Sequence, residues 1–319
     1  AVLNGIDHQG LTAEDCVIAP LPTFHVGGLN IQTLPTLYVG GQVVLQRRFD
    51  PAGVLSLAAE YQATQTLLVP AMLAAVASQP NFADTDLSSL RGINSGSSIV
   101  PAELMQPFFE RGIPVGQVYG TTETGPTAVV LRYDEAADNL GSCGKPAAHT
   151  QLRLVDPDGI DVADGEPGEL WVRGPNIFTG YWGNTQATDE AFAAGGWFRT
   201  GDVGYRSAGG FVYISDRIKD VVISGGENIY PAELEVVLGE HPAICEVAVI
   251  GVKDDRWGEV PVAVVVLSDG ATLELADLSE WCEGRLARFK QPQGLYVVDE
   301  LPRTALGKVK KHELRGASQ

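Results

Sequence analysis

Short apolar runs alternate with amphipathic segments over the first 120 residues, and this alternation limits the fold more than any other feature of the chain. Apolar runs at 43–45, 66–69, 92–94 and 115–119 are separated by helix-like stretches at 50–62 and 71–77 and by a helix that begins at Pro101. Such alternation favours βαβ units in a mostly parallel sheet, with ligand sites beyond the carboxyl ends of the strands. The segments 95–98 and 119–124 fall at that edge.

The pattern changes twice further along the chain. Short β-rich pieces at 151–155, 169–173 and 211–214 are separated by Gly, Pro and Asp, which indicates a small β-barrel or hairpin layer. After Lys219, a helix beginning at Pro231, strands at 247–252, 260–267 and 295–298 and a helix at 275–286 form a compact α+β module. We therefore predict a large domain over 1–218, which is α/β over 1–140 and β-rich over 141–218, and a small mobile C-terminal domain over 219–319.

The charge of the chain excludes a general role on nucleic acid or on anionic membranes. With 22 Lys and Arg against 40 Asp and Glu, the formal net charge is −18, and an acidic surface repels polyanions. One basic cluster stands near the end of the chain, where it is either a local anion site or a solvated tail. Its members are Arg303, Lys308, Lys310, Lys311, His312 and Arg315.

Two further classes of protein lack support. No run of 18 apolar residues occurs, and no basic segment followed by an apolar one opens the sequence, so we predict a cytoplasmic protein without an integral membrane segment. The four cysteines, Cys16, Cys143, Cys245 and Cys282, lie too far apart in sequence for a zinc or redox motif. We expect them to be buried thiols.

Three segments carry residues that suit a nucleotide. The segment 119–125 ends an apolar run with a tyrosine that can stack on a purine, threonine hydroxyls for phosphate and a glutamate for a hard cation. Asp202 offers a carboxylate to ribose hydroxyls, and Arg217 a permanent charge for bidentate contact with oxygens. The segment 224–228 adds a glycine pair beyond them.

In this order, and with Gly307-Lys308 near the end, these segments resemble the adenylate-forming superfamily, and within it the acyl-CoA synthetase branch of fatty-acyl-CoA and 4-coumarate-CoA ligases. The resemblance implies catalytic roles for Lys308, His25, Thr122 and Glu123, with Glu123 also holding Mg²⁺. It further implies a nucleotide site made of Gly96, Ser97, Ser98, Gln117, Tyr119, Gly120, Thr122, Asp202 and Arg217.

The resemblance also divides the second half of the chain into a pivot and a thiol channel. Lys219 matches the hinge between the two domains, and the small domain turns there between two half-reactions. Four residues are then expected to bind CoA: Gly225, Gly226, Trp257 and Lys290. Lys308 places a flexible ammonium between carboxylate and phosphate as charge moves to the leaving pyrophosphate. His25 is expected to gate the acyl and thiol channels.

The implied reaction joins a carboxylic acid to ATP with Mg²⁺, giving acyl-AMP and pyrophosphate, and then transfers the acyl group to CoA. Gly120 stands where acetate-type enzymes place a tryptophan, so the resemblance implies a medium- or long-chain fatty acid or an aryl acid. Two alternatives remain: a peptide-synthetase adenylation domain, although no acid lies near Phe24-His25, and a non-catalytic nucleotide-binding module.

The family's phosphate-binding loop has no counterpart in these 319 residues. Either these 319 residues are a piece of a longer enzyme, or they are one half of a split enzyme whose other half is a separate chain, and both explanations stay open. We therefore expect the 319 residues alone to be inactive.

Overall fold

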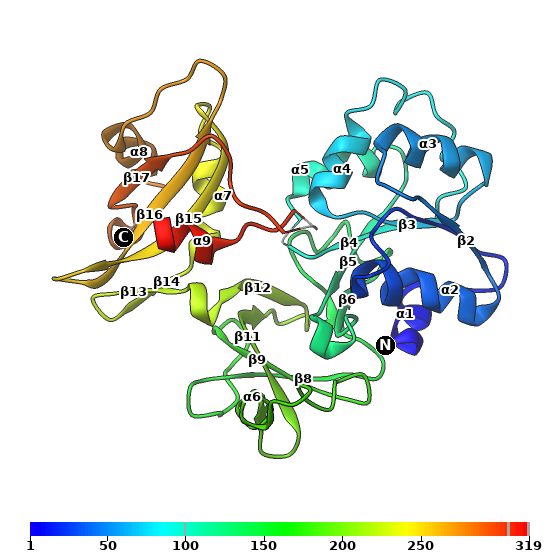
Figure 1. Ribbon diagram of the computed structural model, residues 1–319, viewed down its shortest axis with the longest axis horizontal. Coiled ribbons are helices and arrows are strands. Elements are labelled where there is room, and N and C mark those ends of the chain that lie inside the picture. Colours follow the sequence, from blue (N-terminus) through cyan, green and yellow to red (C-terminus); the bar gives the residue numbers. More distant parts are fainter. Residues whose placement is uncertain (99, 305–306, 318–319) are drawn as a thin grey trace. The chain divides into compact units, whose positions relative to one another are not determined.

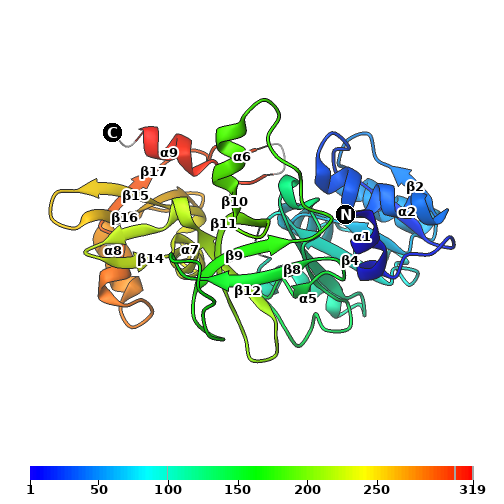
Figure 2. The same ribbon diagram turned by 90° about the horizontal axis from the view of Figure 1, so that it is seen from below.

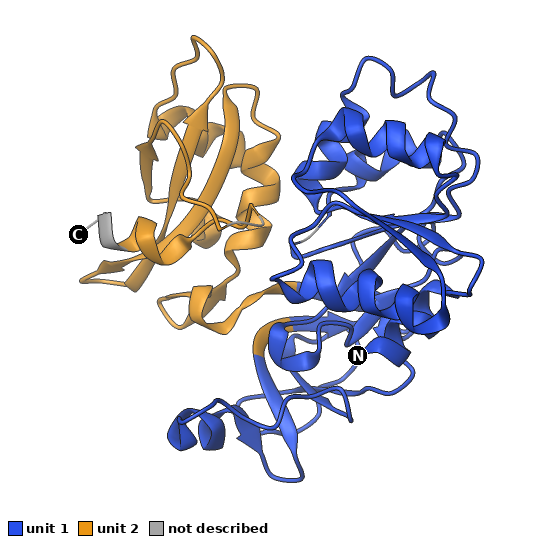
Figure 3. Ribbon diagram, turned by 45° about the vertical axis from the view of Figure 1, so that its right-hand side comes forward, with its two compact units in different colours: residues 1–200, 204–214 blue, residues 201–203, 215–319 orange. Residues whose placement is uncertain are grey.

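The computed structural model describes residues 1–98, 100–304 and 307–317. Figure 3 shows the division of the chain into two compact units: Ala1–Thr200 with Gly204–Ile214 is the first, and Gly201–Val203 with Ser215–Gln319 is the second. The second unit contains the whole of the predicted small domain. The domain boundary and hinge at Lys219 remain predictions.

A seven-stranded sheet forms the centre of the first unit. Its strands lie in the order β2-β1-β3-β4-β5-β6-β7, and the first five pair in parallel, which confirms the mostly parallel sheet. The strands are β1 (Cys16–Ala19), β2 (Gln42–Leu45), β3 (Gln65–Leu67), β4 (Gly92–Gly96), β5 (Val115–Tyr119), β6 (Val129–Leu131) and β7 (Lys145–Pro146).

Helices cover both faces of this sheet (Figure 1). On one face lie α3 (Pro51–Glu60), α4 (Pro70–Ala77) and α5 (Ala102–Phe109), and on the other lie α1 (Val2–Gln9), the π-helix η1 (Gly27–Thr33) and α2 (Leu34–Val39). Proline at the first turn of α3 and α4 fixes φ where no N–H partner exists. Leu55, Leu73 and Phe108 bury their side chains against the sheet in one core, each contributing about 2 kcal/mol.

The β-rich layer predicted after residue 141 is confirmed as a separate five-stranded sheet. Its order is β10-β11-β9-β8, with β12 paired to β11, and Figure 2 shows α6 standing at the β10 end. A short 3₁₀ turn, η2 (Thr122–Thr124), precedes this layer. The elements are β8 (Gln151–Val155), β9 (Gly168–Arg173), α6 (Thr185–Ala191), β10 (Phe192–Ala193), β11 (Trp197–Arg206) and β12 (Val212–Arg217).

The second unit is the predicted α+β module, built on a sheet in the order β14-β13-β16-β15 with β17 on β16. Two cores lie on its opposite faces: Val249 faces the core that contains Leu234 and Leu278, whereas Ala248 faces the core that contains Leu314. The elements are η3 (Ile218–Asp220), β13 (Val222–Ser224), β14 (Glu227–Ile229), α7 (Pro231–Gly239), β15 (Ile244–Asp254), β16 (Gly258–Leu267), α8 (Leu275–Cys282), η4 (Arg288–Lys290), β17 (Gly294–Val297) and α9 (Lys311–Ala317).

Three details differ from the sequence prediction. The helix predicted to reach residue 286 ends at Cys282, because Glu283 is extended and Gly284 is left-handed at φ +74°. Cys245 is exposed rather than buried, although the four cysteines, all in the described part of the chain, form no disulfide. The basic cluster is not a free tail: Arg303, Lys310, Lys311 and Arg315 each form an ion pair within the second unit.

Among the described residues, no helix combines the length and the apolar character that crossing a bilayer requires.

Candidate nucleotide and thiol site

The first group of predicted site residues meets at one edge of the seven-stranded sheet. Strands β4 and β5 are parallel neighbours, with Gly96 paired to Val118, so the loops that follow them begin side by side. The structure thus brings Gly96, Ser97 and Ser98 to the same edge as Tyr119, Gly120 and Thr122. This is the edge at which parallel sheets bind ligands.

Both glycines at this edge are required by close backbone approach. A Cβ on Gly96 would lie 2.4 Å from the carbonyl oxygen of Val118, and one on Gly120 would lie 1.9 Å from that of Pro126. Ser97 has φ +76°, a left-handed conformation that costs a non-glycine residue about 1–3 kcal/mol. Strain of this kind persists where the surroundings enforce it, and it is concentrated at ligand-binding loops.

Gln117 and Tyr119 both lie on β5, and Gln117 is more deeply buried than Tyr119. Gln117 is buried, and its Nε2 has no hydrogen-bond partner among the described residues. A buried donor left unpaired costs about 1–3 kcal/mol, which a polar ligand or water at this edge would relieve. The Tyr119 ring packs beside Val129 and Leu154 in the cluster between the two sheets, so part of its surface serves packing.

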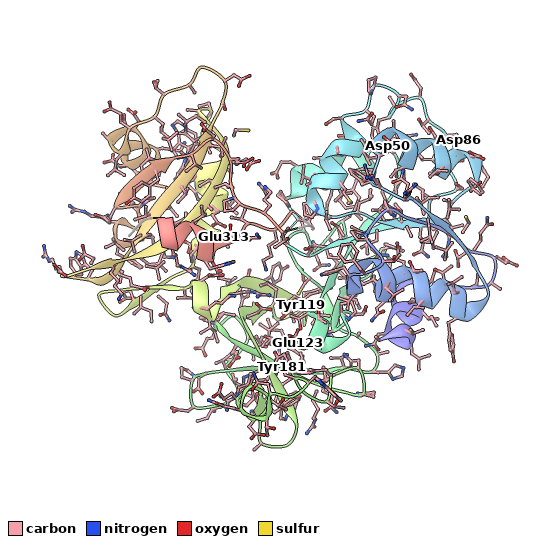
Figure 4. The ribbon with its side chains drawn as sticks, viewed as in Figure 1. Asp50, Asp86, Tyr119, Glu123, Tyr181 and Glu313 are labelled. Atoms are coloured by element: carbon pink, nitrogen blue, oxygen red, sulfur yellow. The ribbon has the colours of Figure 1, made fainter. Side chains whose placement is uncertain are left out.

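The turn η2 presents a hydroxyl and a carboxylate. The Thr124 hydroxyl accepts from the Thr121 N–H at 2.8 Å and closes the turn, while Thr122 is exposed. The Tyr181 hydroxyl donates to Glu123 Oε1 at 3.1 Å, and Figure 4 shows the two side chains in the same region. Burial, and then the Glu123 charge, raise the pKa of Tyr181. Tyr181 was not predicted from the sequence.

Glu123 suits a magnesium ion that arrives with a nucleotide. No group of three or more His, Cys, Asp or Glu residues that could hold a metal occurs within residues 1–98, 100–304 and 307–317. Mg²⁺ is commonly held by one or two carboxylates together with substrate phosphates and water. A single carboxylate on the turn η2 therefore fits the ion, provided that a nucleotide supplies the other ligands.

His25 has a local structural contact. Its Nδ1 accepts from the Gly27 N–H at 3.0 Å, at the start of the π-helix η1. This bond places the ring proton on Nε2 and orients the half-buried ring. The contact holds the ring at the start of η1, and π-helical turns are frequent at functional sites.

Asp202 and Arg217 are brought together in the second unit. They lie on the paired strands β11 and β12, with Arg217 Nε 3.0 Å from Asp202 Oδ1. The aspartate is 3% exposed. The neighbouring guanidinium of Arg217 compensates its charge. Planar donors and a carboxylate side by side suit the hydroxyls of a ribose.

Lys308 lies on a tight turn within electrostatic reach of this pair. The Thr304 N–H donates to the Lys308 carbonyl at 2.8 Å, and Gly307 is left-handed at φ +80°. The pKa of Lys308 is lowered, first by burial and then by the Arg217 charge, whereas Asp202 and Asp220 act in the opposite direction. Lys308 as a whole residue is exposed, so the burial concerns its ammonium end. The ammonium therefore interacts electrostatically with both Asp202 and Arg217.

Gly225 and Gly226 form the two-residue loop of the β13–β14 hairpin. Ser224 pairs with Glu227, and both glycines have positive φ, +59° and +88°. Two-residue hairpin loops require positive φ, so the turn alone is sufficient to explain both glycines. The Trp257 ring covers Gly225, since a Cβ there would lie 2.9 Å from the indole.

The predicted CoA residues do not all lie together. Trp257 is 47% exposed and lies under the guanidinium of Arg256, 4.6 Å from the ring centroid. Lys290 instead lies on η4, where its ammonium contacts both carboxylate oxygens of Glu233 at 2.7 Å. The basic neighbour of Trp257 is thus Arg256, which sequence reasoning missed although it is adjacent in sequence.

Comparison with known proteins gives a consistent family. The family model for AMP-binding enzymes matches residues 1–182, and the family model for the AMP-binding enzyme C-terminal domain matches residues 233–308. The chain is 48% identical to an indoleacetate–CoA ligase of Aromatoleum aromaticum over 98% of its length and 61% of that protein. It is 42% identical to a feruloyl-CoA synthase of Amycolatopsis, covering 98% of this chain and 64% of the relative.

Solved structures agree in fold. The o-succinylbenzoate CoA synthetase MenE from Bacillus subtilis, in complex with its acyl-adenylate OSB-AMP, superposes with a TM-score of 0.90 at 37% identity, over 98% of this chain and 63% of the other. ATP-bound MatB from Rhodopseudomonas palustris gives 0.92 at 34%, over 99% and 62%. The chain spans a little over three-fifths of the length of these relatives. It belongs to the AMP-binding enzyme family, the adenylate-forming superfamily, in its acyl-CoA synthetase branch.

Proposed function

We propose that the chain carries the ribose clamp, the catalytic lysine and the thiol channel of an ATP-dependent acid–CoA ligase that acts on an aryl acid. The observation that carries this proposal is the buried Asp202 paired with Arg217 at 3.0 Å, with Lys308 interacting electrostatically with both. Relatives of similar sequence support it, because they are CoA ligases.

In the first half-reaction the acid attacks the α-phosphate of ATP, and pyrophosphate leaves. Asp202 and Arg217 hold the ribose, and Thr122 donates its exposed hydroxyl to phosphate oxygens. Lys308 stabilises negative charge as it moves toward the leaving group. Mg²⁺ held by Glu123 would neutralise part of the phosphate charge.

In the second half-reaction the small domain turns at Lys219, and the CoA thiol attacks the acyl carbon of acyl-AMP, releasing AMP. The exposed Trp257 offers a ring face to the CoA adenine, and Arg256 a charge to its phosphates. Lys290 contributes only after its pair with Glu233 opens. His25, with its ring oriented by Gly27, gates the channel.

Aryl acids are the preferred substrate class over fatty acids. Indoleacetate, ferulate and 2-succinylbenzoate, named for the relatives, each join an aromatic ring to a carboxyl-bearing chain. A cytoplasmic location remains a prediction, as does the supply of the phosphate-binding loop by another segment or chain.

A panel of acids tests this proposal. The chain would be combined with a polypeptide that carries the family's phosphate-binding loop, and pyrophosphate release would be followed with aryl acetates, cinnamates, benzoates, octanoate and acetate. We expect release with an aryl acid, at a rate at least tenfold above octanoate, and CoA-dependent thioester. ATP binding without pyrophosphate release from any acid would instead support the non-catalytic module.

A further inference from the structure

The basic residues near the end of the chain fasten its last helix. Lys311 contacts Glu235 of α7 at 2.7 Å, and Glu235 also accepts from the Val249 N–H of the edge strand β15 at 2.7 Å. Leu314 is buried against the sheet. Helix α9, red in Figure 1, is thus fixed to the second unit by the Lys311–Glu235 ion pair and by the burial of Leu314. Arg315, one residue further along this helix, has a different partner.

Arg315 contacts the segment that contains the predicted pivot. Its guanidinium donates to Asp220 Oδ1 at 2.8 Å, and Asp220 has a side chain only 13% exposed. Asp220 ends the 3₁₀ turn η3, directly after Lys219. Because α9 is itself anchored, this bond holds the residue on the C-terminal side of Lys219 to the body of the small domain.

A second carboxylate, Asp216, lies on the other side of the pivot. Its Oδ2 accepts from the Ala232 N–H at 2.8 Å, and its Oδ1 accepts from the Arg217 N–H at 2.8 Å. Ala232 lies in the first turn of α7, where N–H groups have no partner within the helix and Tyr230 supplies no side-chain cap. Asp216 therefore caps α7 from a distance, with its charge at the favourable end of the helix dipole.

The two bonds respond differently to rotation at Lys219. Asp220 and Arg315 both follow the pivot, so their bond moves with the small domain. Asp216 precedes the pivot whereas Ala232 follows it, so their bond spans the pivot and must break when the chain turns there. If the chain turns at Lys219, the Asp220–Arg315 bond would persist as an anchor, and the Asp216–Ala232 bond would hold one arrangement only, as a latch.

We propose that Arg315 is a positioning residue for the turn of the small domain, because it confines rotation to the N-terminal side of Asp220. The Asp216–Ala232 bond in turn holds the small domain in the arrangement in which Lys308 serves the first half-reaction. The pivot at Lys219 and the roles in the half-reactions rest on the proposed function, whereas the two bonds themselves are part of the structure.

Hydrogen exchange at single-amide resolution tests the anchor and latch in the 319-residue chain without any ligand. In Arg315→Ala, we expect the Val221 amide, which donates to the Arg217 carbonyl at 3.0 Å, to exchange about tenfold faster, with Ala232 unchanged. In Asp216→Ala, the Ala232 and Arg217 amides accelerate about tenfold instead. Arg315→Lys should restore most of the protection, and Arg206→Ala, which breaks a surface pair with Asp164, should change neither site.

Equal acceleration throughout the second unit in Arg315→Ala, or none at Val221, would overturn the anchor. The same two variants, combined with the phosphate-loop polypeptide, test the roles. We expect Arg315→Ala to lower kcat of thioester formation about tenfold with KM for ATP and acid unchanged, and Asp216→Ala to slow adenylate formation. A chain that forms no adenylate in any variant would refute the proposed function, while the exchange pattern would still decide the anchor and latch.

Discussion

Arg217 Nε lies 3.0 Å from Asp202 Oδ1, and the two side chains join neighbouring strands through a carboxylate that is almost fully buried. A buried carboxylate is costly unless it is paired, and the Arg217 guanidinium supplies one such partner to Asp202. We propose that the pair couples the stability of this corner to the binding of two ribose hydroxyls.

Arg217→Lys and Asp202→Asn should each weaken AMP binding about 10- to 100-fold, because lysine lacks the planar fork and asparagine the charge. Isothermal titration with AMP, using the 319-residue chain, measures the change. Asp164→Asn, which removes an acid from a surface ion pair with Arg206, is the matched control and should bind as the parent does. Parent-like affinity in Asp202→Asn would remove Asp202 from the site.

Gly225→Ala and Gly226→Ala should differ although both glycines have positive φ. Each substitution adds backbone strain of about 1 kcal/mol, but only the Cβ at Gly225 collides with the Trp257 ring, at 2.9 Å, whereas nothing lies within 4 Å of that at Gly226. We expect Gly225→Ala alone to change tryptophan fluorescence and to raise KM for CoA. Identical spectra for the two variants would contradict the placement of Trp257 over Gly225.

His8 should make the stability of the first unit fall in acid. Burial lowers its pKa from 6.5 to about 4, against the hydrogen bond that His8 Nε2 donates to Asn94 Oδ1, with smaller opposed effects of Arg132 and Asp7. Between pH 6.5 and about 4, the unfolded chain takes up a proton that the folded chain excludes. The free energy of unfolding therefore drops across that window by about 3 kcal/mol, and above pH 7 His8 adds no pH dependence.

Urea unfolding of the first unit at pH 7 and pH 4.5 measures this loss. In His8→Gln, the difference between the two pH values should shrink by about 2 kcal/mol. His149→Gln, which changes an exposed histidine in the same unit, should leave the difference intact. An unchanged difference in His8→Gln would show that His8 titrates normally.

Glu123→Gln should weaken binding of ATP in the presence of Mg²⁺ about tenfold or more, while AMP binding stays within twofold, because only the metal-bearing phosphates lose a ligand. Titrations with and without EDTA separate the two effects. Tyr181→Phe, which removes the hydroxyl that donates to Glu123, should produce a smaller change in the same direction. Equal losses for ATP and AMP would argue that Glu123 supports the turn rather than the ion.

Periodicity was sufficient to predict the central sheet and its helices, because β3, β4 and β5 and α3, α4 and α5 each carry an apolar pattern of their own period. It did not predict α1, whose buried face is polar. Asn4, His8 and Gln9 bury side chains that form hydrogen bonds with Thr127, Asn94 and Ile31, far away in sequence. Tertiary hydrogen bonds of this kind leave no local signal.

The site shows the same limit. Motif order was sufficient to select Asp202 and Arg217, whose pairing the structure shows at 3.0 Å. Motif order was not sufficient to predict the contact of Tyr181 with Glu123, because the two residues are 58 positions apart in sequence. For the same reason it did not predict the pairing of Lys290 with Glu233, which are 57 positions apart. The glycine pair was interpreted as room for a thiol arm, whereas its positive φ values are first required by the hairpin turn.

Acyl-adenylate formation by Lys308→Ala is the most direct test of the central claim. The 319-residue chain alone should form none, whereas the chain combined with a phosphate-loop polypeptide should form it from an aryl acid and ATP. In that combination we expect Lys308→Ala to lower the rate at least 100-fold, and Lys310→Ala, which only breaks the pair with Glu313, to stay within threefold. A near-parental rate of adenylate formation in Lys308→Ala would contradict the account.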